Sequence, residues 1–244
     1  MKKILVLLMS FGVVGSALAT KISIEEKTCS VCGRKDKYSV VASYNTFGST
    51  IYLDSRVSGG KKPNHFIKRC EKCNLVGYSI EKPVCDNQND IVKSSEYQNF
   101  FKKGKITYSD EYLAYAFLLE KCNAEDKRIA GAYLDAAWNA DDRQDNESAV
   151  SCRKKALPYF EKLDGLENRL VLLDIYRRTG DFENARRLAS KIGRRGNECH
   201  IEDMIEFQKE LIKNKDSDNH AVRDNDCKKE SKSPKYHWFW SLFK

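Results

Sequence analysis

Two Cys-x-x-Cys pairs limit the possible folds of this chain more than any other feature of its sequence. The first pair is Cys29 and Cys32, and the second is Cys70 and Cys73. Four thiolates at this spacing can meet at one zinc ion, which is bound tetrahedrally with Zn–S distances of ~2.3 Å. A glycine follows the first pair and an asparagine the second, and these residue types readily adopt the left-handed conformation that wraps a chain around a metal. The sequence therefore predicts a structural zinc site with these four cysteines as ligands.

Two alternatives stay open for these four thiols. In an exported protein they could form disulfides, within the pairs or between them. One pair could instead be a redox motif, which normally begins a helix that follows a strand. The residues that follow Cys32 are polar and do not begin an apolar helical face. The sequence therefore favours a four-thiolate metal site over disulfides, and both over redox catalysis.

The first 19 residues have the pattern of a secretory signal peptide. Lys2 and Lys3 precede an uncharged, mostly apolar run over residues 4–14, and small residues follow at Ala17 and Ala19. The run is shorter than the ~20 residues of a membrane-spanning helix. We therefore expect cleavage after Ala19 and a periplasmic or secreted protein, with an uncleaved N-terminal anchor as the alternative.

The remaining cysteines give a mixed signal. Nine cysteines in an exported chain normally indicate disulfides, but the number is odd and only four lie in paired motifs. Cys122 and Cys152 fall on apolar faces of predicted helices, which favours buried free thiols. Cys85, Cys199 and Cys227 lie in polar surroundings. At least one thiol is therefore left free or pairs between chains.

Residues 20–90 are predicted to form a small zinc-ribbon-like β module. Short segments rich in β-branched and aromatic residues lie around the cysteine pairs, at residues 38–43, 50–53, 66–67 and 76–80. Turn-forming residues separate these segments. Because their apolar content is too small for an independent core, a metal or a crosslink is expected to supply much of the stability.

Three polar side chains of this module have more than one interpretation. His65, five residues before Cys70, is either an ordinary exposed histidine or a contact of the metal site. Asp54 and Arg56 flank Ser55 and form either a local ion pair, worth ~0–1 kcal/mol, or a pair that faces a ligand. Their spacing alone does not decide between these roles.

Residues 96–214 are predicted to form antiparallel helical hairpins. From Ser109 onward apolar residues recur every three or four positions, which is typical of amphipathic helices. The predicted stripes are Tyr112, Leu113, Ala116 and Phe117; Ile129, Ala130, Tyr133, Leu134, Ala137 and Trp138; Ala149, Cys152, Ala156, Phe160 and Leu163; Leu166, Leu170 and Leu173; Phe182, Ala185, Leu188, Ala189 and Ile192; and Ile201, Met204, Ile205, Gln208, Leu211 and Ile212. Gly180 and Asp181 supply the clearest helix stop and start. Residues 170–189 resemble the turn region of a tetratricopeptide repeat, and a plain helical bundle is the alternative.

Two features of these helices need the structure to decide them. Pro158 lies inside the third stripe, where it predicts a kink or a break. A set of mostly charged residues lies close together at the end of the second predicted helix. It either lines a site beside an aromatic ring or is a solvated helix end. Its members are Trp138, Asn139, Asp141, Asp142 and Arg143.

Residues 215–244 are predicted to be a flexible tail with an aromatic end. Residues 213–235 are polar and mixed in charge, which favours disorder. Residues 236–244 then gather tryptophan, tyrosine and phenylalanine, which favours a docking peptide or an interfacial contact with the cell envelope. A cap on the last helix is the alternative.

Four groups of residues follow one another in an order typical of one bacterial family. They are Cys29-x-x-Cys32-Gly33; Asn45-x-Phe47-Gly48 with Leu53-Asp54-x-Arg56; Cys70-x-x-Cys73 with Gly77-Tyr78; and Ala136-Ala137-Trp138 with Asp141-Asp142 and Cys152-Arg153. Over most of residues 27–163 the chain thus resembles the family known as domain of unknown function 2225. Glu71 and Asn74 stand where that family usually has proline and glycine. The resemblance implies a zinc-ribbon-like segment joined to tetratricopeptide-like helices, and it implies no reaction.

Together these patterns predict an α+β fold, mainly α, and an exported, non-catalytic interaction or scaffold protein. A protein or peptide partner is expected on the helical face. A thiol redox protein and a nucleic-acid-binding zinc ribbon are the alternatives. Nucleic acid is disfavoured by export and because the net charge of +8 is not gathered into a basic stripe with interleaved aromatics. No catalytic triad, phosphate loop or nucleotide fingerprint is visible.

Overall fold

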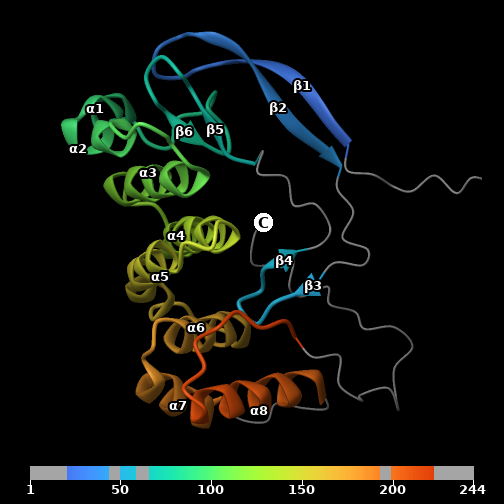
Figure 1. Ribbon diagram of the computed structural model, residues 1–244. Coiled ribbons are helices and arrows are strands. Elements are labelled where there is room, and N and C mark those ends of the chain that lie inside the picture. The colour runs from blue at the N-terminus through green and yellow to red at the C-terminus, as the bar shows by residue number, and fades with distance from the viewer. Residues whose placement is uncertain (1–20, 44–49, 59–65, 193–198, 223–244) are drawn as a thin grey trace, which may run out of the picture.

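The fold is known for residues 21–43, 50–58, 66–192 and 199–222, which the computed structural model describes. Most of these residues are helical, and short antiparallel strands lie on the N-terminal side (Figure 1). The predicted class, α+β and mainly α, is confirmed. The predicted signal peptide, His65 and the aromatic end of the chain lie outside the described residues.

Three separate antiparallel hairpins make up the β structure of this part of the chain. Their strands are β1 (Lys21–Thr28) with β2 (Lys35–Ser43), β3 (Thr50–Ile51) with β4 (Val57–Ser58), and β5 (Lys68–Arg69) with β6 (Val76–Gly77). The first and third hairpins each carry one cysteine pair in their turn. The middle hairpin belongs to the long insert between the two pairs.

Strand β1 is the longest element of the module that the sequence pattern does not predict. Four of its eight residues are charged, and its two isoleucines face solvent, with 47% of Ile22 and 72% of Ile24 exposed. It nevertheless pairs with β2 along its whole length, from Lys21 opposite Ser43 to Thr28 opposite Lys35. Because β1 buries almost none of its side chains, the apolar alternation that marks a half-buried strand is missing.

A short apolar connector joins the β module to the helices. It consists of α1 (Gln88–Lys93), α2 (Ser95–Gln98) and the 3-10 helix η1 (Asn99–Phe101). Tyr97 is fully buried there, and its ring lies between 5.7 and 6.5 Å from the rings of Phe100, Phe101 and Phe117. The connector thus joins the module and the helices in one continuous core.

Six longer helices follow and stack in chain order (Figure 1). They are α3 (Tyr108–Lys121), α4 (Asp126–Asp142), α5 (Asn146–Phe160), α6 (Leu166–Arg178), α7 (Phe182–Lys191) and α8 (Cys199–Lys213). Each helix packs against the next, and most residues of the predicted apolar stripes are buried between them. None of the described helices is long and apolar enough to cross a membrane.

The link between α6 and α7 has the predicted helix stop and start. Gly180 adopts a left-handed conformation with φ +79°, and the Asp181 side chain accepts a hydrogen bond from the Asn184 backbone N–H. Short links of this kind reverse the chain, so neighbouring helices run antiparallel. The tetratricopeptide-like character of the hairpins stays a prediction.

The break predicted at Pro158 is not present. Helix α5 runs through Pro158 as one element and ends two residues later, at Phe160. A proline this close to a helix end removes a backbone donor where few further turns depend on it. The last turn is closed instead by the Glu161 N–H, which donates to the Leu157 carbonyl at 3.0 Å.

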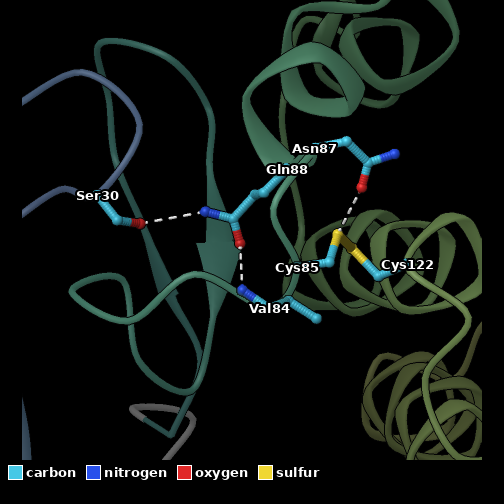
Figure 2. Close-up of a disulfide and its surroundings, with 6 residues drawn as sticks. All are labelled: Ser30, Val84, Cys85, Asn87, Gln88 and Cys122. Atoms are coloured by element: carbon cyan, nitrogen blue, oxygen red, sulfur yellow. Dashed lines mark hydrogen bonds between the residues drawn. A yellow bond between two sulfur atoms is a disulfide. The ribbon is translucent and has the colours of Figure 1, made fainter.

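The free thiol predicted at Cys122 is wrong. Cys122 forms a disulfide with Cys85, with Cα atoms 5.6 Å apart (Figure 2). Cys122 is the C-cap residue of α3, where its side chain can reach the last residues of the β module. Cys152, by contrast, is buried and free, as predicted. The bond therefore fastens the end of the module to the first long helix.

Residues 215–222 also differ from the prediction of a flexible tail. The Val222 N–H donates to the Ile51 carbonyl at 2.7 Å, and the Leu53 N–H donates to the His220 carbonyl at 3.1 Å. Residues 220–222 therefore lie alongside β3. In Figure 1 the chain that follows α8 passes α6 on its way to this strand. Arg177 fixes it further by donating to the carbonyls of Asp216 and Asp218. The sequence does not predict this ordered segment, because the contacts just described are made by its backbone groups and leave no apolar pattern.

Replacing both Cys85 and Cys122 by serine is expected to lower the free energy of unfolding by about 2–5 kcal/mol, because the bond closes a loop in the unfolded chain. The bonded residues are 37 positions apart. Denaturant unfolding under non-reducing conditions measures the difference between the double variant and the wild type. Alkylation of Cys85 and Cys122 in unfolded, unreduced wild-type protein would contradict the bond.

Candidate metal centre

The four predicted ligand atoms converge. The sulfurs of Cys29, Cys32, Cys70 and Cys73 all lie within 4.8 Å of one another. Sulfurs of the two motifs approach each other closely, with 3.6 Å between Cys29 and Cys73 and 3.5 Å between Cys32 and Cys70. Tetrahedral zinc with Zn–S distances of ~2.3 Å holds its sulfurs ~3.8 Å apart, so the cluster has the size of such a site.

Two turns of the same backbone design present these sulfurs. We call residues 29–34 the first knuckle and residues 70–75 the second knuckle. In the first, the Gly33 N–H donates to the Cys29 carbonyl and the Cys29 N–H donates to the Arg34 carbonyl, both at 2.9 Å. In the second, the Asn74 N–H donates to the Cys70 carbonyl at 2.7 Å, and the Cys70 N–H donates to the Leu75 carbonyl at 2.8 Å.

The left-handed positions predicted after each pair are found. Gly33 has φ +69° and Asn74 has φ +61°. These values turn the backbone back toward the first cysteine of each knuckle, which closes the hydrogen bonds just described. A residue with a β-branched side chain would be strained at either position.

The helices hold the second knuckle in place. Gln98 accepts a hydrogen bond from the Asn74 side chain at 2.8 Å and donates to the Cys73 carbonyl at 3.0 Å. The Tyr97 hydroxyl donates to the Asn74 carbonyl at 3.0 Å and accepts from the Val76 N–H at 3.1 Å. Both partners belong to α2, so the second knuckle is built onto the connector.

The first knuckle is held through the segment that carries the disulfide. The Ser30 N–H donates to the Ile80 carbonyl at 2.8 Å. Figure 2 shows the Gln88 side chain bridging Ser30 and Val84: it donates to the Ser30 hydroxyl at 3.1 Å and accepts from the Val84 N–H at 2.8 Å. Cys85, the next residue, is bonded to α3. Both knuckles are thus positioned before any metal is considered.

The protonation chemistry of the thiols suits a metal that displaces protons. Burial raises the pKa of Cys29 and, more strongly, that of Cys73. Burial also opposes ionisation of Cys32, but hydrogen bonds from the Arg34 backbone amide and from neighbouring thiols lower the pKa of Cys32 to about 7. Since thiolates are the metal ligands, a bound cation would supply the positive charge that stabilises these sulfurs in their deprotonated form.

The geometry weighs against both alternatives for these thiols. Cys85 and Cys122 are bonded, whereas the four cysteines of the cluster are free although their sulfurs converge. Neither pair begins a helix: Cys32 lies in a turn before β2, and Cys73 lies in a turn before β6. The cluster is therefore one that could hold a metal ion, and zinc itself stays a prediction.

A second cluster, which the sequence only hinted at, lies where the middle hairpin meets the helices. Asp54 is fully buried and accepts hydrogen bonds from the Trp138 indole N–H at 2.8 Å and from Arg153 at 3.1 Å. Asp141 is bonded to Arg153 at 2.6 and 3.2 Å, and to both terminal nitrogens of Arg178 at 3.0 Å. We call these five residues the buried ionic cluster.

The sequence motifs contain four members of this cluster without placing them together. Asp54 and Arg56 do not form the local ion pair considered above; Arg56 instead pairs with Asp142 at 2.7 Å and donates to the Trp138 carbonyl at 3.1 Å. The charged end of α4 is thus partly buried rather than a fully solvated turn. Arg178 was missed altogether, because it lies on α6, far along the chain, and nothing in the repeat-like pattern around it points to Asp54 or Asp141.

Electrostatics explains how the cluster is tolerated. Burial alone would raise the pKa of Asp141, but the hydrogen bond and charge of Arg153, with the charge of Arg178, hold it below its ordinary value. Burial likewise disfavours charge on Arg153, and Asp141 and Asp54 more than offset this, so the pKa of Arg153 is raised. Each buried charge therefore has an opposite charge in contact with it.

Comparisons of the chain with protein-family models, with curated proteins and with solved structures found no match. The resemblance to domain of unknown function 2225 therefore stays a prediction.

Serine in place of any one of the four clustered cysteines is expected to remove most of the bound zinc, because a hydroxyl is a poor substitute for a thiolate ligand. Cys152→Ser is the matched control, since Cys152 is also buried and free but lies outside the cluster. Elemental analysis of the purified proteins should give about one zinc per chain for the wild type and this control. Wild-type zinc content in all four cluster variants would contradict the site.

Asp141→Asn is expected to cost about 3–5 kcal/mol of unfolding free energy, since it leaves two buried guanidinium groups with one carboxylate. Asp142→Asn is the matched control: its side chain is 55% exposed, against 8% for Asp141, so we expect a loss of about 0–1 kcal/mol. Because the pKa of Asp141 is lowered by folding, its contribution is present above pH ~4 and is lost as the pH falls through the native pKa. Denaturant unfolding should therefore show the cost of Asp141→Asn shrinking in acid, and equal costs for the two variants at neutral pH would be the contrary result.

Proposed function

We propose that this chain is an exported, non-catalytic interaction protein whose β module is built around a structural zinc ion. The observation that carries the proposal is the convergence of four cysteine sulfurs within 4.8 Å on two knuckles of equivalent backbone design. Cys29, Cys32, Cys70 and Cys73 would hold the metal. Zinc with four thiolate ligands is one of the common structural forms of this ion in proteins.

A structural role fits the ligand set better than catalysis. Catalytic zinc normally keeps one coordination position for water or substrate, with histidine or carboxylate among its protein ligands. Four thiolates fill a tetrahedron. Cys29 and Cys70 are fully buried, so their sulfurs are poorly placed to attack an external disulfide. An ion bound by these four cysteines would lie between two hairpins and would fasten them to each other.

Export is supported by the second use of cysteine in this chain. Disulfides form and persist in secreted and periplasmic proteins and are rare in reducing compartments. The bond between Cys85 and Cys122 therefore agrees with the signal-peptide pattern of the first 19 residues. A zinc site and a disulfide can coexist when the thiols of the metal site are bound before they are oxidised.

An interaction role is the part of the proposal that rests on the helices. Stacked antiparallel helices present one continuous face, which is a common platform for protein and peptide partners. Where this face meets the middle hairpin, charged side chains lie beneath the surface: Arg153 is fully buried and Arg178 nearly so. We place a protein or peptide partner on this helical face.

Thiol reactivity separates a structural zinc site from a redox centre. In the mature, metal-loaded protein we expect the four clustered thiols to resist a thiol-specific reagent until a chelator removes the metal, and we expect no reduction of a disulfide substrate such as insulin. Mass spectrometry after labelling identifies the thiols that react. A Cys-x-x-Cys pair that reacts rapidly while metal stays bound would favour the redox protein instead.

A further inference from the structure

The tip of the middle hairpin inserts a carboxylate, that of Asp54, among side chains of the helices. The tip is a self-contained turn, in which the Tyr52 N–H donates to the Arg56 carbonyl at 2.8 Å and the Ser55 N–H donates to the Tyr52 carbonyl at 3.0 Å. Between them, Asp54 projects its carboxylate into the helical stack and is 0% exposed. One carboxylate oxygen accepts from Trp138 and Arg153, and the other accepts from the Arg56 backbone N–H at 3.2 Å.

The side chains that surround the Asp54 carboxylate all come from the helices. Trp138 comes from α4, Arg153 from α5 and Arg178 from α6, and Asp141 of α4 orients both arginines. Without Asp54, these groups would carry two positive charges and one negative charge. A buried cation without a counter-charge is strongly disfavoured. The site therefore requires one more carboxylate, and the chain supplies it from a segment that lies outside the helices.

Asp54 does not use all the hydrogen-bond donors of Arg153 and Arg178. The Nε atoms of Arg153 and Arg178 are buried and have no hydrogen-bond partner among the described residues. Arg178 also lies 3.7 Å from the Asp54 carboxylate, an ion-pair distance rather than a hydrogen bond. Unsatisfied buried donors cost free energy. Asp54 thus neutralises the site but leaves it incompletely bonded.

The hairpin that carries Asp54 has little stability of its own. Each of its strands, β3 and β4, has two residues, and a two-stranded hairpin of this size is not stable alone in water. Ser55 at the tip has φ +68°, a left-handed conformation that is energetically unfavourable for a residue with a side chain. The hairpin therefore owes its place to Asp54, to the Arg56 contacts at the rim and to its backbone bonds with residues 220–222.

We propose that Trp138, Arg153 and Arg178 form a carboxylate-binding site, which the chain fills with its own Asp54. The occupant that replaces Asp54 is an aspartate in a short turn of a partner protein. This inference rests on the proposed function, because it names the part of the helical face that the partner contacts. The hairpin is then an internal competitor, and the partner binds when the hairpin leaves.

The position of the hairpin in the sequence sets the strength of this competition. It lies between the two knuckles, whose sulfurs at Cys32 and Cys70 are 3.5 Å apart across 38 positions of chain. A segment tethered at both ends acts at an effective concentration on the order of 1 mM. A free peptide with the same turn should therefore bind weakly to the wild type and more tightly to a chain whose hairpin has lost its carboxylate.

The test uses full-length, metal-loaded protein and a synthetic peptide of residues 50–58. Trp238→Phe and Trp240→Phe are introduced throughout, so that Trp138 is the single indole reporter. In the Asp54→Asn background we expect the peptide to bind about 10-fold or more tightly than in the background that keeps Asp54. Binding should return the Trp138 indole N–H resonance toward its position in that Asp54-containing protein. A peptide with asparagine in place of Asp54 should bind about 10-fold or more weakly.

One further variant serves as the control for the test. Addition of Arg153→Gln to the Asp54→Asn protein should abolish peptide binding while circular dichroism and zinc content stay unchanged. If the Asp54→Asn protein is folded and binds neither peptide, or binds both equally, the carboxylate-binding site is refuted and Asp54 is a structural ion only.

Hydrogen exchange of the Asp54-containing protein covers the case in which Asp54→Asn does not fold. The backbone amides of Tyr52, Leu53 and Arg56 should then exchange through a local opening of lower free energy than the amides in the middle of α4. Exchange of both sets only by global unfolding would overturn the inference. The proposed function fails by a separate route, through absence of zinc or a reactive Cys-x-x-Cys, and peptide binding does not depend on that result.

Discussion

The structure depends on four sulfur atoms that two turns, each held by a different part of the chain, bring together. The first knuckle hangs from the segment that leads to the Cys85–Cys122 disulfide, and the second is built onto the connector at Tyr97 and Gln98. The first hairpin buries little apolar surface of its own, since none of the side chains of β1 is fully buried. A metal ion at Cys29, Cys32, Cys70 and Cys73 would join them directly, and it would also close the loop that contains the middle hairpin.

The buried ionic cluster is the other end of this arrangement. The long insert leaves the module after β2, places Asp54 among α4, α5 and α6, and returns to the second knuckle at β5. The C-terminal segment pairs with β3 on the same side, so distant parts of the chain meet at one place. Metal binding and docking of the insert therefore act on the same loop, and each is expected to favour the other by restricting it.

Local patterns predicted most of this fold, whereas contacts between distant segments were missed. The apolar periodicity located the six longer helices but not the short connector helices, and Gly33, Asn74 and Gly180 were recognised because a left-handed turn restricts the residue type. By contrast, β1 has no apolar face, and the Cys85–Cys122 bond joins segments whose proximity no local pattern encodes. The cluster of Asp54, Arg153 and Arg178 was missed for the same reason, since its members lie on an insert and two separate helices.

X-ray absorption spectroscopy at the zinc edge of the purified mature protein tests the central claim most directly. We expect a first shell of about four sulfur atoms at ~2.3 Å, with no nitrogen or oxygen ligand. Zinc bound through nitrogen or oxygen, or a protein without zinc whose Cys29, Cys32, Cys70 and Cys73 are joined as disulfides, would contradict the account.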